Sequence, residues 1–102
     1  MKMSRKITTL KLQTRAKRPQ QEVVLPSNAI IIDVQLIDEG FCETSIELTI
    51  LGGDETEKGA FIVAQKTDFV VGEVDYIGKA AEVSRHGRTG YEKTYYIFKV
   101  KQ

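Results

Sequence analysis

The residue types best suited to ligand binding are concentrated in one short segment, residues 84–91. The sequence SRHGRTGY contains two arginines, a histidine, two hydroxyl side chains, two glycines and a tyrosine. Guanidinium groups form paired hydrogen bonds with phosphate, and aromatic rings stack on bases. Arg85, His86 and Arg88 are therefore the candidate phosphate-binding residues. The simpler alternative is a hairpin tip that is polar because it is solvated.

The other reactive side chains form no pattern that indicates catalysis or a metal centre. Ser84 lies two residues before His86, but no residue that would orient this single histidine is evident, as nucleophilic catalysis requires. Asp54, Glu55 and Glu57 lack the ligand order of a calcium loop, and zinc sites need several histidines or cysteines. No glycine-rich nucleotide-binding motif is present. We expect a protein that is not an enzyme, with no catalytic residues, no metal and no cofactor.

Positive charge is concentrated at the N-terminal end. Residues 1–18 contain seven of the 15 lysines and arginines and none of the 14 acidic residues. Such an arm ahead of a mildly acidic body is typical of a domain that contacts an anionic partner. Residues 7–12 alternate in polarity and are expected to pair into a sheet. The candidate partner-binding or polyanion-binding residues are therefore Lys2, Arg5, Lys6, Arg15, Lys17 and Arg18.

The nature of that anionic partner is left open by the sequence. The first 40 residues contain no phenylalanine, tyrosine or tryptophan, so the aromatic residues that stack on bases are missing from the arm. Sequence-specific nucleic-acid recognition is therefore not expected. Nonspecific contact with the phosphates of a nucleic acid and contact with an acidic protein surface remain equal alternatives.

Alternation of apolar and polar residues with a period of two predicts an all-β domain. Glycine, proline and asparagine clusters separate the alternating stretches, as turns require. About seven short strands in 102 residues indicate a single antiparallel β-sandwich over residues 21–102, preceded by a basic arm over residues 1–20 that is partly a strand. A small β-barrel is the alternative. The expected strands cover residues 6–12, 21–25, 29–37, 42–51, 59–65, 69–77 and 93–101, and residues 79–83 are either an eighth strand or one helical turn.

Three of these strands carry specific expectations about their faces. In residues 42–51, the predicted core face carries Cys42, Thr44, Ile46, Leu48 and Ile50, so the thiol is interpreted as buried and inert. In residues 29–37, the predicted core face carries Ile30, Ile32, Val34 and Leu36. Residues 93–101 are apolar on both faces, which predicts a central strand or one that a partner covers.

Composition also limits the location. The longest apolar runs are a few residues, far below the roughly 20 that span a bilayer, and the N-terminus lacks the apolar core of a signal peptide. A single cysteine cannot form an internal disulfide, which favours a reducing compartment. We expect no membrane contact and a location in the cytoplasm or, if the chain is viral, in the virion or the host cytoplasm.

One resemblance adds to this description. The order of three short motifs resembles the pattern of small uncharacterised β-sandwich proteins of tailed bacteriophages. The motifs are Leu25, Pro26, Ala29 and Ile30, then Tyr76, Ile77 and Gly78, then the aromatic strand Tyr96–Phe98. The resemblance covers residues 23–100 and implies an auxiliary capsid or virion accessory protein. The expected function is therefore structural: docking through the basic arm onto a larger protein assembly such as a capsid, with homo-oligomerisation open. The alternative is a phage protein that binds or sequesters nucleic acid or a nucleotide.

Overall fold

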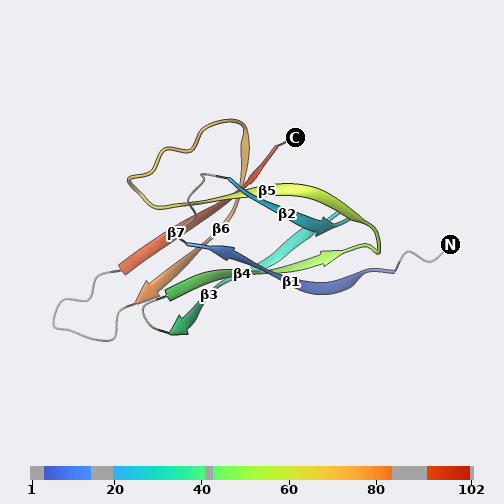
Figure 1. The fold of residues 1–102 in the computed structure, drawn as a ribbon, viewed down its shortest axis with the longest axis horizontal. Coiled ribbons are helices and arrows are strands. Elements are labelled where there is room, and N and C mark those ends of the chain that lie inside the picture. The colour runs from blue at the N-terminus through green and yellow to red at the C-terminus, as the bar shows by residue number, and fades with distance from the viewer. Residues whose placement is uncertain (1–3, 15–19, 41–42, 84–91, 102) are drawn as a thin grey trace.

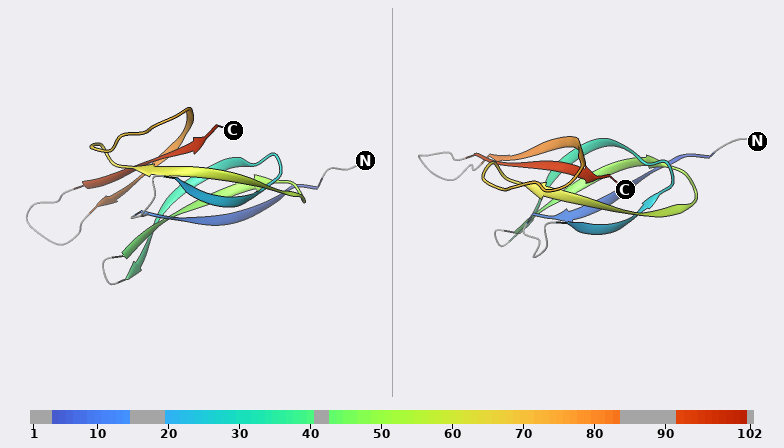
Figure 2. Two further views of the ribbon diagram at one scale, coloured as in Figure 1. Left: turned by 45° about the horizontal axis from the view of Figure 1, so that its top comes forward. Right: turned by 90° about the horizontal axis from the view of Figure 1, so that it is seen from above.

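The computed structural model describes residues 4–14, 20–40, 43–83 and 92–101, and every regular element in these ranges is a β-strand (Figure 1). The strands form a three-stranded sheet in the order β1-β4-β3 and a four-stranded sheet in the order β2-β5-β7-β6, with all pairs antiparallel. The two sheets pack face to face as separate layers rather than closing into a barrel (Figure 2). The predicted β-sandwich is confirmed. The strands are β1 (Lys6–Gln13), β2 (Gln21–Pro26), β3 (Ile30–Gly40), β4 (Glu43–Gly52), β5 (Thr56–Ala64), β6 (Val74–Val83) and β7 (Glu92–Val100).

The inner face of the three-stranded sheet is a regular grid of side chains, most of them apolar. In β4, Ile46, Leu48 and Ile50 are buried, whereas Glu47 and Thr49 lie on the other face, as the alternation predicted. Burying a side chain of this size contributes roughly 1.5–3 kcal/mol to stability, so these side chains supply much of the hydrophobic stabilisation of the fold. The rows that cross β1, β4 and β3 are Thr8-Ile50-Ile31, Leu10-Leu48-Val34 and Leu12-Ile46-Leu36.

The four-stranded sheet has β7 as a central strand between β5 and β6. Tyr95 and Ile97 of β7 are buried in the core beside Phe61 of β5. Tyr96 and Phe98 alternate with them on the outer face and are half-buried. This confirms the prediction that the strand is central, which explains why it is apolar on both faces.

A β-bulge in β3 overturns one predicted face. The pairing of β3 with β4 shifts register between Ile31 and Asp33, so one extra residue is inserted at Ile32. The extra residue reverses the inward–outward phase at the start of the strand. Ile31 therefore packs against the core with Val34, whereas Ile30 and Ile32 are 48% and 49% exposed. The prediction that Ile30 and Ile32 share the core face with Val34 is wrong.

The sixth strand also differs from its prediction. It covers Val74–Val83 rather than residues 69–77, and the undecided segment 79–83 is its second half. Strands β5 and β6 are both antiparallel to β7 and hence parallel to each other, so residues 65–73 form a crossover over β7. This crossover runs on the side of the four-stranded sheet that faces away from the other sheet (Figure 2).

Two turns interlock at one end of the sandwich. The Ser27 N–H donates to the Glu55 carbonyl at 2.7 Å, and the Gly53 N–H donates to the Ser27 carbonyl at 2.9 Å. The Pro26 ring lies directly against Gly52, where a side chain would collide with it. Asn28, which follows Ser27 in this turn, adopts a left-handed conformation with φ of 53°, which asparagine tolerates better than most residues.

Candidate interaction surfaces

The predicted basic residues are only partly within the described structure. Arg5 and Lys6 are exposed at the start of β1. Within the described residues, β1 pairs with a single strand, β4, and so forms one edge of its sheet. The part of the predicted arm that forms β1 is thus anchored, because Leu12 belongs to the core. The other predicted partner-binding residues, Lys2, Arg15, Lys17 and Arg18, lie outside the described residues.

The predicted phosphate-binding loop lies outside the described residues as well, and so does Cys42. In the sequence, Arg85, His86 and Arg88 belong to the segment between β6 and β7. The phosphate-binding assignment therefore stays a prediction.

A cationic cavity lies at the end of the four-stranded sheet where β7 begins. Its volume is about 230 Å³, and it is lined by Gln65, Lys66, Thr67, Lys93 and Thr94. Lys93 and Thr94 are the second and third residues of β7, directly after Glu92. The Lys66 ammonium group and the two threonine hydroxyls are suitable donors for an anion such as phosphate, whereas Lys93 lies opposite Glu82 in the register of β6 and β7.

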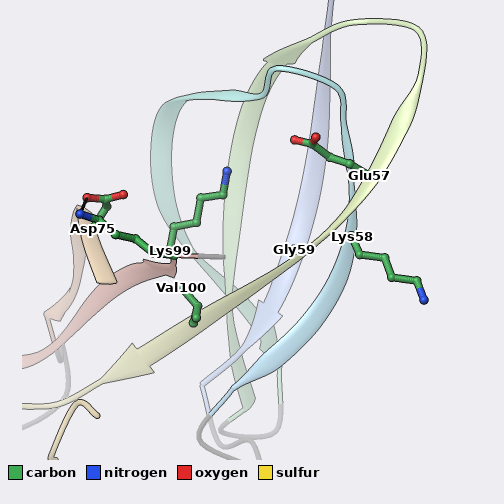
Figure 3. A pocket seen from close by; sticks show the side chains of 7 residues that line it. Glu57, Lys58, Gly59, Asp75, Lys99 and Val100 are labelled. Atoms are coloured by element: carbon green, nitrogen blue, oxygen red, sulfur yellow. Dashed lines mark ion pairs between the residues drawn. The ribbon is translucent and has the colours of Figure 1, made fainter. Parts of the chain in front are cut away.

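A larger cavity of about 320 Å³ lies at the other end of this sheet and has mixed charge. Lys99 and Glu57 project on the same side of the sheet, whereas Lys58 and Val100 point elsewhere (Figure 3). The Asp75 carboxylate forms an ion pair with Lys101 Nζ at 3.6 Å, and both side chains are more than half exposed. Such an exposed ion pair contributes at most about 1 kcal/mol to stability. Because side chains of both charges line this cavity, it favours neither an anionic nor a cationic ligand.

The crossover presents the most exposed apolar side chains of the described chain. Phe69 is 93% exposed and Val71 is 77% exposed, while Val70 between them is half-buried. A turn fixes the start of this segment: the Asp68 N–H donates to the Gln65 carbonyl at 3.0 Å, and the Gln65 N–H donates to Asp68 Oδ2 at 2.8 Å. An isolated apolar side chain on a surface is normal, but two from one short segment make this crossover a candidate contact surface.

A second apolar surface crosses the outer face of the three-stranded sheet. Ile7, Leu51 and Ile30 are direct neighbours in the register of β1, β4 and β3. Ile7 is 63% exposed, and the bulged Ile32 lies close by in sequence with half of its surface exposed. The next rows, Thr9-Thr49-Asp33 and Lys11-Glu47-Gln35, are polar, so the apolar surface is confined to one end of the sheet.

The free edge of β1 carries an unusual side-chain contact. The Gln13 N–H donates to Gln21 Oε1 at 2.8 Å, and Gln21 Nε2 donates to the Gln13 carbonyl at 2.7 Å. Nearby, the Thr14 hydroxyl donates to the Thr44 carbonyl at 3.0 Å. The first residue of β2 is thereby tied to the end of β1, which couples the two sheets at this edge.

Sequence reasoning missed both apolar surfaces. Phe69 and Val71 were assigned to a regular strand, and their exposure depends on the crossover, which a local pattern does not reveal. Ile30 was assigned to the core because the bulge is not visible in the sequence. The Lys66-Thr67-Asp68 turn directly before Phe69 is compatible with an ordinary three-residue hairpin loop, so no local signal identified the crossover.

The described residues contain no group of three or more histidine, cysteine, aspartate or glutamate side chains that could hold a metal ion. Within those same ranges, no helix is long and apolar enough to cross a membrane. Comparison with protein-family models, curated proteins and solved structures gives no match to this chain.

Proposed function

We propose that this chain is a non-enzymatic binding domain that docks onto a larger protein assembly, in the manner of an auxiliary capsid or virion accessory protein of a phage. The observation that carries the proposal is the exposed pair Phe69 and Val71 on the crossover. Burying each side chain against a partner would contribute roughly 1.5–3 kcal/mol before the costs of association. The phage-type assembly is suggested by the sequence resemblance, and the docking mode by the surface.

Two features favour a protein partner over a small ligand. Phe69 and Val71 are apolar, highly exposed and line neither of the two cavities described above, whereas small-ligand sites are concave with a few convergent polar groups. The basic arm adds electrostatic attraction to an acidic partner, which raises the rate and selectivity of encounter more than the affinity. An assembly with many copies of one site multiplies such individually weak contacts.

The test is to isolate large particles by density gradient from cells that encode the chain, and to quantify the chain in them by mass spectrometry. The proposal expects the chain in the particle fraction at a fixed ratio to a major structural protein. Recovery of the chain only as a small free protein would contradict it.

A second candidate function, binding of a nucleotide or another polyanion, is favoured by the cavity at which Lys66 and the hydroxyls of Thr67 and Thr94 meet. Isothermal calorimetry with tripolyphosphate and with a random oligonucleotide distinguishes the two functions. Phosphate binding that depends on Lys66 would support the second function. Nonspecific binding of the oligonucleotide alone is expected to be no tighter than about 10⁻⁴ to 10⁻⁶ M near physiological salt.

A further inference from the structure

The side-chain amide of Gln21 occupies the place of a neighbouring strand beside β1. It accepts a hydrogen bond from the Gln13 N–H at 2.8 Å and donates one to the Gln13 carbonyl at 2.7 Å. Paired residues of an antiparallel ladder exchange the same two bonds. Because both backbone groups of Gln13 are bonded to Gln21, they are directed away from β4, in which Ser45 is the register partner of Gln13.

This contact fixes the hydrogen-bonding phase of the whole strand. The N–H and carbonyl of one residue point to the same side of a strand, and the side alternates from residue to residue. Ile7 and Thr9 have the same phase as Gln13, so their backbone groups are directed to the free edge. Leu10 and Leu12 have the opposite phase and direct their groups to β4.

The edge of β1 is also more regular than the other edges. It pairs with β4 over eight residues without a register shift, whereas the pairings of β3 and β6 are each interrupted by a bulge. The remaining edge strand, β2, has six residues and ends in Pro26. A straight, uninterrupted edge is the best template for an added strand.

The charge of this edge selects its partner. Arg5 and Lys6 are exposed at the start of β1, and residues 1–18 contain no acidic residue. Two copies of the chain pairing along β1 would place two basic strands side by side with no acidic residue in either, and lysines on an edge strand commonly prevent such self-association. An acidic strand would instead be attracted. The charge argument rests on Arg5 and Lys6, because Lys11 faces Glu47 in the register with β4.

We infer that the free edge of β1 accepts an extended, acidic segment of a partner protein as an added strand. The backbone of Ile7 and Thr9 supplies the hydrogen bonds, Arg5 and Lys6 supply the charge, and the exposed Ile7 side chain contacts an apolar residue of the added strand. The Gln21 amide ends the ladder at Gln13. The inference rests on the proposed docking function and specifies the chemistry of the partner.

The probe is a short synthetic peptide that alternates glutamate and valine, titrated into the isotope-labelled full chain and followed by NMR amide exchange. The inference expects exchange at Thr9 and Ile7 to slow by about tenfold or more at saturation, because new hydrogen bonds protect these amides. Leu10, already bonded to β4, should change little. A peptide of alternating lysine and valine is the matched control and should not bind.

Thr9→Pro is the decisive variant. Proline at position 9 removes a donor only from the free edge, and edge strands tolerate proline in that phase. The variant should keep its melting temperature within a few degrees and lose peptide binding. Leu10→Pro, one residue away, should lower the melting temperature strongly because it removes a bond to β4.

Peptide binding that survives in folded Thr9→Pro, or equal binding of the lysine peptide, would overturn the inference. If Thr9→Pro does not fold, amide exchange in the parent chain without peptide tests the assigned phase. Equal protection of the Thr9 and Leu10 amides would contradict it. The titration uses the isolated chain, so its failure is distinguishable from absence of the chain in a large assembly.

Discussion

Gln65 and Asp68 hold each other through two hydrogen bonds, one from the Asp68 N–H to the Gln65 carbonyl and one from the Gln65 N–H to the Asp68 carboxylate. The two bonds close a tight turn directly after β5. Phe69 follows this turn at once, so the turn determines where the most exposed aromatic ring of the described chain is presented.

Asp68→Ala should therefore loosen the crossover more than it destabilises the fold. Losing one exposed hydrogen bond costs about 0.5–1.5 kcal/mol at most, whereas the crossover becomes freer to open locally. Limited digestion with chymotrypsin, which cleaves after Phe69, should proceed several times faster in the variant. Asp68→Asn, which keeps an acceptor oxygen, is the control and should resemble the parent. Equal digestion rates in all three proteins would show that this turn does not hold Phe69.

Leu48→Ala should lower the free energy of unfolding by about 2–5 kcal/mol, because it leaves a cavity in the central row between Leu10 and Val34. Glu47→Ala, one residue away on the outer face, should cost less than about 1 kcal/mol. A denaturant titration compares the two variants. Similar losses for both would contradict the register of β4.

Gly52→Ala should be markedly more destabilising than Gly53→Ala. An added Cβ at Gly52 collides with the Pro26 ring, which cannot move away, and overpacking of this kind costs roughly 1–3 kcal/mol. An added Cβ at Gly53 lies 2.5 Å from the Ser27 hydroxyl, which can rotate. Thermal unfolding of both variants measures the difference, and a larger loss for Gly53→Ala would contradict the interlocked turns.

Binding of tripolyphosphate provides the fourth prediction. If the cavity at Lys66 binds phosphate, replacing Lys66 by glutamine should weaken binding several-fold with little change in melting temperature, because the Lys66 side chain is exposed. Replacing Arg85 and Arg88 by alanine tests the predicted loop in the same assay. Calorimetry that detects no phosphate binding by the parent would reject both sites and with them the second candidate function.

Local sequence pattern was sufficient for the parts of the fold that depend on one strand and its alternation. Ile46, Leu48 and Ile50 were recognised as core residues because β4 is central and solvated on one face. The central position of β7 was recognised from its two apolar faces. These features follow from the period of two, which any regular strand must show.

The parts that sequence did not reveal depend on pairing between distant segments. The bulge at Ile32 is a property of how β3 matches β4, and it reverses the side-chain phase without any local sign. The exposure of Phe69 follows from the parallel relation of β5 and β6, which forces the chain to cross β7. The hydrogen bonds between Gln21 and Gln13 join two sheets and were equally hidden.

Co-sedimentation of the chain with its assembly tests the docking function most directly. The parent chain and the double variant Phe69→Ser, Val71→Ser should be expressed at equal levels in cells that make the particles, with circular dichroism showing that both are folded. The account predicts the parent in the particle fraction and the variant mainly in the free fraction, because the variant loses most of the apolar contact. Equal sedimentation of both proteins, or a parent chain that nuclease treatment releases from nucleic acid, would contradict it.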